Sequence, residues 1–227
     1  MDGQEHGVHV RDRKASEEYV ASLPRWDELR VERTVERLRR ARMERGPCAA
    51  TRAWLDGPLD LWLERLRQGR VDLDEETMGA LAVGMNQVLS IRDAMILSLL
   101  HDEERCDRET LMRLASRPRA DSSRALVREL LVEAFEDEEG PDLERCQSGV
   151  TMLSAMAAIM PPAARVQQHA TLAYMLWWTG DPRAPLYALR ALADDGRCVL
   201  AALVLGACES GMHPASVGGG EAVREGT

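Results

Sequence analysis

Apolar residues recur along most of the chain at the three- and four-residue spacing of amphipathic α-helices. One block with this spacing contains Leu59, Trp62, Leu63 and Leu66. Pairs such as Gly57-Pro58 and Pro161-Pro162 divide the blocks and are expected to end helices. Phe135 is the only phenylalanine, so aromatic residues that favour strands are scarce. The chain is therefore predicted to be all-α and to fold as an irregular multi-helix bundle.

Two features of this pattern mark the predicted core. Residues 90–102 are apolar nearly all round, which predicts a central helix. Ser90 with Asp93 resembles a capping box at the start of that helix. Gly149 lies inside another predicted helix, where glycine costs about 1 kcal/mol relative to alanine, so we expect a close contact between helices there.

Residues 169–207 carry the sharpest pattern of the sequence. An apolar helix ends at Gly180-Asp181, an alanine-rich helix follows, and an acidic turn leads into a third apolar helix. Glycine suits the left-handed turn that ends a helix, so Gly180 is expected to adopt it. Trp177 and Trp178 are neighbours and face different directions, so we expect at least one in the core and the other half exposed at an interaction surface. This segment resembles one tetratricopeptide unit without a second copy, which predicts a TPR-like C-terminal helical hairpin.

The same region also resembles the C-terminal part of an actinobacterial family, the domain of unknown function 4192. The resemblance covers roughly residues 73–205. It is carried by the Trp-x-x-Gly-Asp turn at Trp177, by the helix start VLSIRDAMIL at Val88–Leu97, and by Pro161-Pro162. Family members usually begin with a half that bears a P-x-D-L-L-x-x-V-P-x-L-L-G signature, and this chain has no such segment. The resemblance implies a helical fold and an actinobacterial origin, and it implies no established activity.

Four parts are predicted along the chain. Residues 1–15 are expected to be disordered, and residues 16–70 to form an N-terminal helical segment. Residues 71–210 are expected to form a C-terminal α-helical domain, and the glycine-rich residues 211–227 a flexible tail.

The long helix predicted from Pro24 to Arg45 is very charged, and its apolar stripe is narrow. The stripe contains Trp26, Leu29, Val35 and Leu38. Because a helix gains most of its stability from a buried face, we expect this one to be either mobile or ordered by a partner that covers the stripe. A homodimer is the simplest version of that hypothesis.

Charge and cysteine content narrow the functional classes. The formal net charge is −9 at pH 7, which argues against broad nucleic-acid binding. Lys14 is the only lysine among 29 basic residues, a bias typical of GC-rich genomes. Five cysteines without a C-x-x-C pair or an apolar leader predict reduced thiols and a cytoplasmic location. The longest apolar run is too short to cross a bilayer, so no membrane contact is expected.

Single polar residues offer only weak candidates for chemistry. His6 and His9 lack a third metal ligand, so we expect no metal or cofactor. His101 is interpreted as a histidine at the C-terminal end of a helix, and His169 as a polar residue in a first helical turn, although either is a candidate for a ligand site. Arg92 is expected to pair with an acidic residue of a neighbouring helix, and anion binding is the alternative. Asp93 is expected to cap its own helix and not to pair with Arg92.

Three functional hypotheses follow. The first is a non-enzymatic protein–protein interaction module that meets an unknown partner through the C-terminal hairpin, favoured because no catalytic set is visible. The second is a small-ligand-binding protein or enzyme whose site forms only in the fold. The third is a regulator that contacts nucleic acid through the arginine-rich stretch 37–45.

Overall fold

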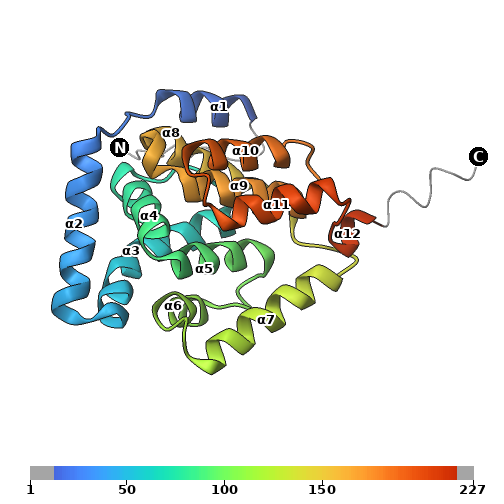
Figure 1. The fold of residues 1–227 in the computed structure, drawn as a ribbon, viewed down its shortest axis with the longest axis horizontal. Helices are drawn as coiled ribbons and strands as arrows, with labels where there is room; N and C mark the ends of the chain where they lie inside the picture. Colours follow the sequence, from blue (N-terminus) through green and yellow to red (C-terminus); the bar gives the residue numbers. More distant parts are fainter. Residues whose placement is uncertain (1–12, 219–227) are drawn as a thin grey trace, which may run out of the picture.

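The computed structural model describes residues 13–218, and within that range it contains twelve α-helices, one short 3-10 turn and no strand (Figure 1). The all-α multi-helix fold predicted from the sequence is confirmed. The elements are α1 (Arg13–Ser22), α2 (Glu28–Arg45), α3 (Pro47–Gln68), α4 (Glu75–Gln87), α5 (Leu89–Leu100), α6 (Arg108–Ser116), α7 (Asp121–Glu136), α8 (Leu143–Ile159), η1 (Pro162–Ala164), α9 (Val166–Trp178), α10 (Ala184–Asp194), α11 (Val199–Glu209) and α12 (Ala215–Gly218).

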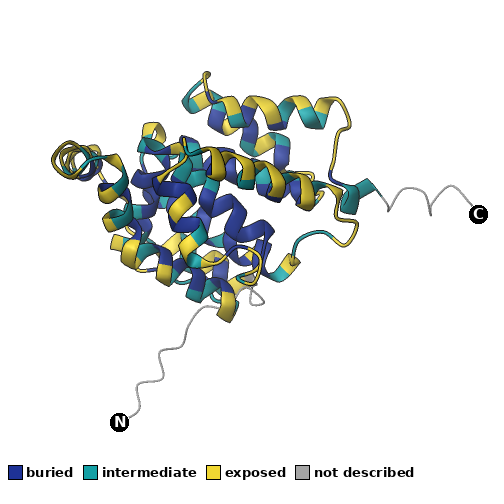
Figure 2. Cartoon of the chain, turned by 90° about the horizontal axis from the view of Figure 1, so that it is seen from below, coloured by how far each residue is buried: buried dark blue, intermediate teal, exposed yellow. Residues whose placement is uncertain are grey.

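The centre of the core is formed by α5 and α8, which are buried along most of their lengths. Figure 2 shows the buried residues gathered in the middle of the molecule, with exposed residues on the outer sides of the surrounding helices. A Cβ atom at Gly149 of α8 would overlap the side chain of Leu99 on α5. The close helix contact predicted at Gly149 is therefore confirmed.

One large core joins helices from both sides of residue 70, so the division predicted there is not a boundary of the core. Trp62 of α3 shows the connection, because its indole N–H donates a hydrogen bond of 2.9 Å to the Ser98 hydroxyl of α5. A second, smaller apolar cluster lies between α9, α10 and α11, and alanines such as Ala173, Ala188 and Ala201 form most of it.

Two predicted local signals are wrong. The helix does not end at Gly57-Pro58, because α3 continues through Pro58. Proline removes one backbone hydrogen bond, but Leu55 and Leu59 on either side are both buried, and their packing outweighs that loss. The box at Ser90 and Asp93 is also absent, since α5 begins after Val88 and the Ser90 hydroxyl donates to the Ala115 carbonyl at 2.7 Å.

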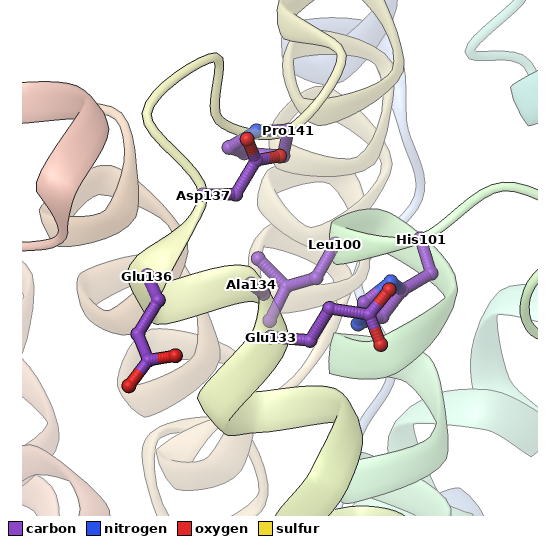
Figure 3. A pocket seen from close by; sticks show the side chains of 7 residues that line it. All are labelled: Leu100, His101, Glu133, Ala134, Glu136, Asp137 and Pro141. Atoms are coloured by element: carbon purple, nitrogen blue, oxygen red, sulfur yellow. The ribbon is translucent and has the colours of Figure 1, made fainter.

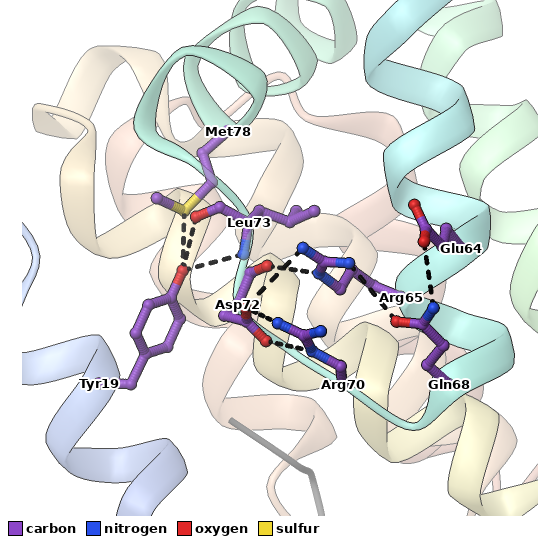
Figure 4. A network of polar contacts seen from close by, with 8 residues as sticks. All are labelled: Tyr19, Glu64, Arg65, Gln68, Arg70, Asp72, Leu73 and Met78. Carbon is purple, nitrogen blue, oxygen red and sulfur yellow. Dashed lines mark hydrogen bonds and ion pairs between the residues drawn. The ribbon is translucent and has the colours of Figure 1, made fainter. Parts of the chain in front are cut away.

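The N-terminal helix α1 is fixed by one tyrosine (Figure 4). The Tyr19 hydroxyl donates to the Leu73 carbonyl at 2.8 Å and accepts from the Leu73 N–H at 3.1 Å. Burial raises the pKa of Tyr19 to about 12, so it stays a donor at neutral pH. Arg65 donates to the Asp72 carbonyl at 2.7 Å and holds the same loop. The predicted disorder of residues 1–15 is thus wrong for 13–15, which belong to α1, and residues 1–12 lie outside the described range.

Part of the predicted flexible tail packs onto the fold. Trp177 donates its indole N–H to the Met212 carbonyl at 2.8 Å, and the short helix α12 contacts α7. Residues 211–218 are therefore held against α7 and α9, whereas 219–227 lie outside the described range.

Candidate functional site

The stripe predicted as a partner surface on α2 is mostly turned inward, so that prediction is wrong. Trp26 is 5% exposed and Leu38 is fully buried, whereas Val35 is half-buried and only Leu29 is open, at 58%. Val31 and Thr34 widen the inner face of the helix, and they were not counted in the stripe. This broader face gives α2 enough buried contact to pack on its own chain.

Trp26 explains most of that packing. Its backbone N–H donates to the Ile159 carbonyl at 2.7 Å, and its indole N–H donates to the Glu75 carboxylate at 2.8 Å. The Arg30 guanidinium lies 4.1 Å from the ring centroid on one side. A Cβ atom at Gly79 would overlap the ring, so the absence of a side chain there makes room for it. Trp26 is a structural anchor between α2, α4 and α8.

The tryptophan pair divides as expected. Trp178 is buried, whereas Trp177 is half-buried and packs at 6.2 Å between ring centroids against Phe135. The helix then ends at Gly180, which has a φ of 67°. The Gly180 N–H bonds to the Trp177 carbonyl and the Asp181 N–H to the Leu176 carbonyl, which is the pattern of a Schellman turn. The Asp181 carboxylate pairs with Arg183 at 2.7 Å and fixes the start of α10.

Arg92 behaves differently from the prediction. Its guanidinium bonds to the carboxylate of the adjacent Asp93 at 2.6 Å, and it donates to the Gln167 amide oxygen of α9 at 2.9 Å. The expectation that neighbouring arginine and aspartate side chains could not meet is wrong, because the long arginine side chain folds back to the next carboxylate. Arg92 therefore links α5 to α9 through an amide, not through an acidic residue of another helix.

His101 lines a cavity of about 380 Å³ at the ends of α5 and α7 (Figure 3). Its Nε2 atom lies 3.0 Å from the Leu130 carbonyl oxygen. A carbonyl can only accept, so this nitrogen carries the proton and the ring is anchored to α7. Glu133, another lining residue, pairs with Arg105 at 2.6 Å. The cavity wall is acidic, and its lining holds no serine, threonine or cysteine nucleophile.

His169 lies in the seam between α9 and α10 and lines none of the cavities described here. Its Nδ1 atom is 3.5 Å from a carboxylate oxygen of Asp194, which also accepts from Arg165 at 3.0 Å. Burial lowers the pKa of His169, and the nearby Arg165 adds to that effect. The geometry gives His169 a packing role between the two helices.

The arginine-rich stretch of α2 is largely engaged with its own chain. Arg39 donates to the Gln87 side chain at 3.2 Å, and Arg42 donates to the Thr51 hydroxyl at 2.9 Å. The Arg37 guanidinium lies 5.1 Å from the ring centroid of Trp54, and Arg40 is within 3.8 Å of Glu36. Little of the stretch is left to form a continuous basic face.

The structure instead exposes an apolar face that sequence reasoning missed. Val199 and Leu203 on α11 are 71% and 65% exposed, and Leu186 and Leu189 on α10 are about half exposed. A signal for this face was present, since no charged residue lies between Arg197 and Glu209. From the sequence this run is identified only as an apolar helix, because the sequence alone does not tell an open apolar side from a buried one.

Other classes of site find little support in the described residues. No group of three or more histidine, cysteine or acidic side chains in residues 13–218 is placed to hold a metal ion, and His6 and His9 lie outside this range. The five cysteines are unpaired. Within the same range no single helix is long and apolar enough to cross a membrane, although α4 and α5, bent by 117° relative to each other, reach that length together.

Comparisons of the chain with protein-family models, with curated proteins and with solved structures found no match.

Proposed function

We propose that this chain is a protein–protein interaction module and that the outer face of α11 is its contact surface. The single observation that carries the proposal is the exposed, uncharged stripe at Val199 and Leu203. In proteins built from stacked helices, the terminal helix needs a polar outer face to stay soluble. An apolar face on an edge helix is the kind of surface that partners cover.

An amphipathic helix of the partner fits this face best. Ala202 and Gly206 lie one turn apart on the exposed side of α11, and a Cβ atom at Gly206 would meet nothing within 4 Å. Small residues beside Val199 and Leu203 would let the backbone of another helix approach closely. A second copy of the chain is one partner of this kind.

The proposal also covers the type of hairpin, the family and the location of the protein. The Schellman turn at Gly180 and the alanines between α9 and α10 support a tetratricopeptide-like hairpin. The relation to the domain of unknown function 4192, and with it an actinobacterial origin, rests on the sequence resemblance. The unpaired cysteines support a cytoplasmic location.

Site-specific photo-crosslinking tests the contact surface. A photoreactive phenylalanine analogue replaces Leu203 in one variant and Leu29 in a matched control, since both leucines are exposed on edge helices. In cells of the native host, position 203 should give a discrete protein adduct that position 29 does not give, and adding Val199→Glu should remove it. The same faint adducts at both positions would contradict the proposal. An adduct of twice the chain mass would identify the partner as a second copy.

The small-ligand hypothesis remains a second candidate because of Arg145. This guanidinium is nearly buried, its Nε donates to the Ser98 carbonyl at 2.7 Å, and its Nη2 has no hydrogen-bond partner beside a cavity of about 320 Å³. A buried cation without a bonded anion is costly, so a carboxylate or phosphate is the fitting group to meet Arg145. Because Asp102, Glu133 and Asp142 line the same cavity, the fitting ligand also carries an amine. Melting curves with a panel of such zwitterions should show a rise in wild type that Arg145→Met loses; equal curves would reject the hypothesis.

A further inference from the structure

A cavity of about 420 Å³ lies between α2, α3 and α4, and Figure 1 shows α2 at the edge of the molecule. A second cavity of about 480 Å³ adjoins it along α2 alone and shares Arg37, Ala41 and Arg45 with it, and together the two form one groove. The apolar lining of the first cavity is formed by Ala41, Ala50, Ala53, Trp54, Pro58 and Ala80. Most of these side chains are small, so they leave room for a side chain from outside.

Trp54 forms the one large wall of the groove. The residue is half-buried, and its indole N–H donates to the Ala80 carbonyl at 2.9 Å, which fixes the ring against α4. The Arg37 guanidinium sits 5.1 Å from the ring centroid. Tryptophan and arginine side by side are the residues most enriched at the energetic centres of protein interfaces.

The backbone of α3 adds a polar feature to the same wall. Pro58 has no N–H to donate to the Trp54 carbonyl, four residues earlier, so this carbonyl lacks its usual donor in the helix. The two residues that create this feature both line the groove. A backbone N–H of an extended peptide is a suitable donor for it, because the N–H groups inside a helix are already bonded.

The rim of the groove along α2 is basic in a chain whose formal net charge is −9. Arg33, Arg37 and Arg45 are exposed along it. On the opposite rim, Glu76 accepts from Arg30 at 2.8 Å, but Arg30 also pairs with Glu75, so that rim keeps a negative charge and the positive charge is confined to α2. Glu36, which pairs with Arg40, and Glu44 also lie on the outer side of α2. Both interrupt the positive surface.

We propose that this groove binds an acidic peptide segment of a partner protein. An apolar side chain of that segment lies against Trp54, and its carboxylates pair with Arg37 and Arg45. The glutamates between the arginines oppose a nucleic-acid backbone, which needs a continuous basic surface. The groove is on other helices than the α11 face, so this inference does not depend on the function proposed above.

Fluorescence anisotropy with labelled peptides tests the inference. The probe is a short peptide of alternating aspartate and glutamate with one central leucine, and the second probe replaces that leucine with glycine. The double variant Arg37→Glu with Arg45→Glu removes the basic rim. Arg124→Glu with Arg197→Glu is the matched control, since it changes the net charge equally at exposed sites on α7 and the α10–α11 turn. Ala53→Glu fills the exposed floor without touching the core, and circular dichroism checks that each variant folds.

Wild type should bind the leucine peptide, and the Arg37→Glu/Arg45→Glu variant and Ala53→Glu should each weaken binding about tenfold or more. The control pair should stay within about twofold, and the glycine peptide should bind about tenfold more weakly than the leucine peptide. Unchanged binding in the rim variant, or no preference for leucine, would overturn the proposal. Tighter binding of a single-stranded oligothymidylate would overturn it in favour of nucleic acid. If the wild-type chain self-associates and the rim variant does not, the proposal of a separate partner would be overturned. The ligand would then be the acidic residues Glu136–Glu139 of a second copy.

Discussion

The two edge helices α2 and α11 resemble each other in how little they bury and differ in what they show to solvent. Inside the fold, α2 contributes Val31, Thr34 and Leu38 to the buried set, and α11 contributes Ala201 and Val204. Outside, α2 carries arginine and glutamate along its length, whereas α11 carries no charge before Glu209. The outer face of α2 is therefore mostly charged, whereas the outer face of α11 presents apolar side chains to solvent.

A sparse apolar stripe on a charged helix, such as that of α2, therefore does not by itself indicate a partner surface. Most of the α2 stripe is used by contacts within the chain, with Trp26 as the anchor and only Leu29 left open. The outer residues of α11 do not belong to the apolar cluster between α9, α10 and α11, and they stay exposed. In this molecule a contact surface is indicated by apolar side chains that stay exposed after the core is packed.

The largest expected effect is at the anchor of α2. Trp26→Ala should lower the free energy of unfolding by about 3–5 kcal/mol, because it removes a buried ring and its contacts to Glu75 and Gly79. Urea unfolding followed by circular dichroism measures the change. A loss below about 1 kcal/mol would mean that Trp26 does not anchor α2, and it would contradict the contrast drawn between α2 and α11.

The next effect concerns the turn that positions α10 and α11. Gly180 has a φ of 67°, and a Cβ atom there would lie 3.1 Å from Val217. Gly180→Val should therefore cost about 1–3 kcal/mol through backbone strain. Thermal melting reports it, with Gly206→Val as a control at an open helical glycine. Equal losses in the two variants would show that the left-handed turn is not the cause.

A smaller effect is expected from the seam beneath α11. Burial holds the pKa of His169 below its ordinary value, so the folded chain takes up a proton there less readily than the unfolded chain. The stability from a neutral His169 is full above the unfolded pKa of about 6.5 and is lost as the pH falls below it. His169→Gln should reduce the drop in melting temperature between neutral pH and about pH 5.5. The same drop in both proteins would contradict this assignment.

The smallest effect on stability, and the sharpest contrast, comes from exposed leucines. Leu203→Glu on α11 and Leu29→Glu on α2 should each change the free energy of unfolding by no more than about 0.5 kcal/mol. Only Leu203→Glu should abolish the adduct formed from a crosslinker at position 199. Loss of that adduct in the Leu29 variant as well would contradict the assignment of the contact surface to α11.

The sequence was sufficient for features that depend on local chemistry. The all-round apolar pattern of residues 90–102 predicted a central α5, and Gly149 and Gly180 predicted a helix contact and a turn. The capping box at Ser90 and the break at Pro58 failed because tertiary packing overrode them. These errors come from contacts that a local pattern does not contain.

The candidate surfaces were predicted less well, for a related reason. An uncharged helix looks the same in sequence whether neighbours surround it or one side is open, so the exposure of Leu203 was not visible. The groove at Trp54 forms only where α2, α3 and α4 pack together. The spacing of residues along the chain does not predict that these three helices are neighbours. The resemblance to the domain of unknown function 4192 stays a prediction.

The hydrogen bond from Trp26 to Ile159 also sets an order of events during synthesis. Its two ends are separated by more than half of the chain, so α2 cannot reach its final contact until α8 has left the ribosome. Until then Trp26 and the inner face of α2 have only part of their binding surface, although α2 has already emerged. A helix made well before α8 therefore waits for α8 to be locked in place, and a chain halted before residue 159 would present its tryptophan to chaperones and proteases.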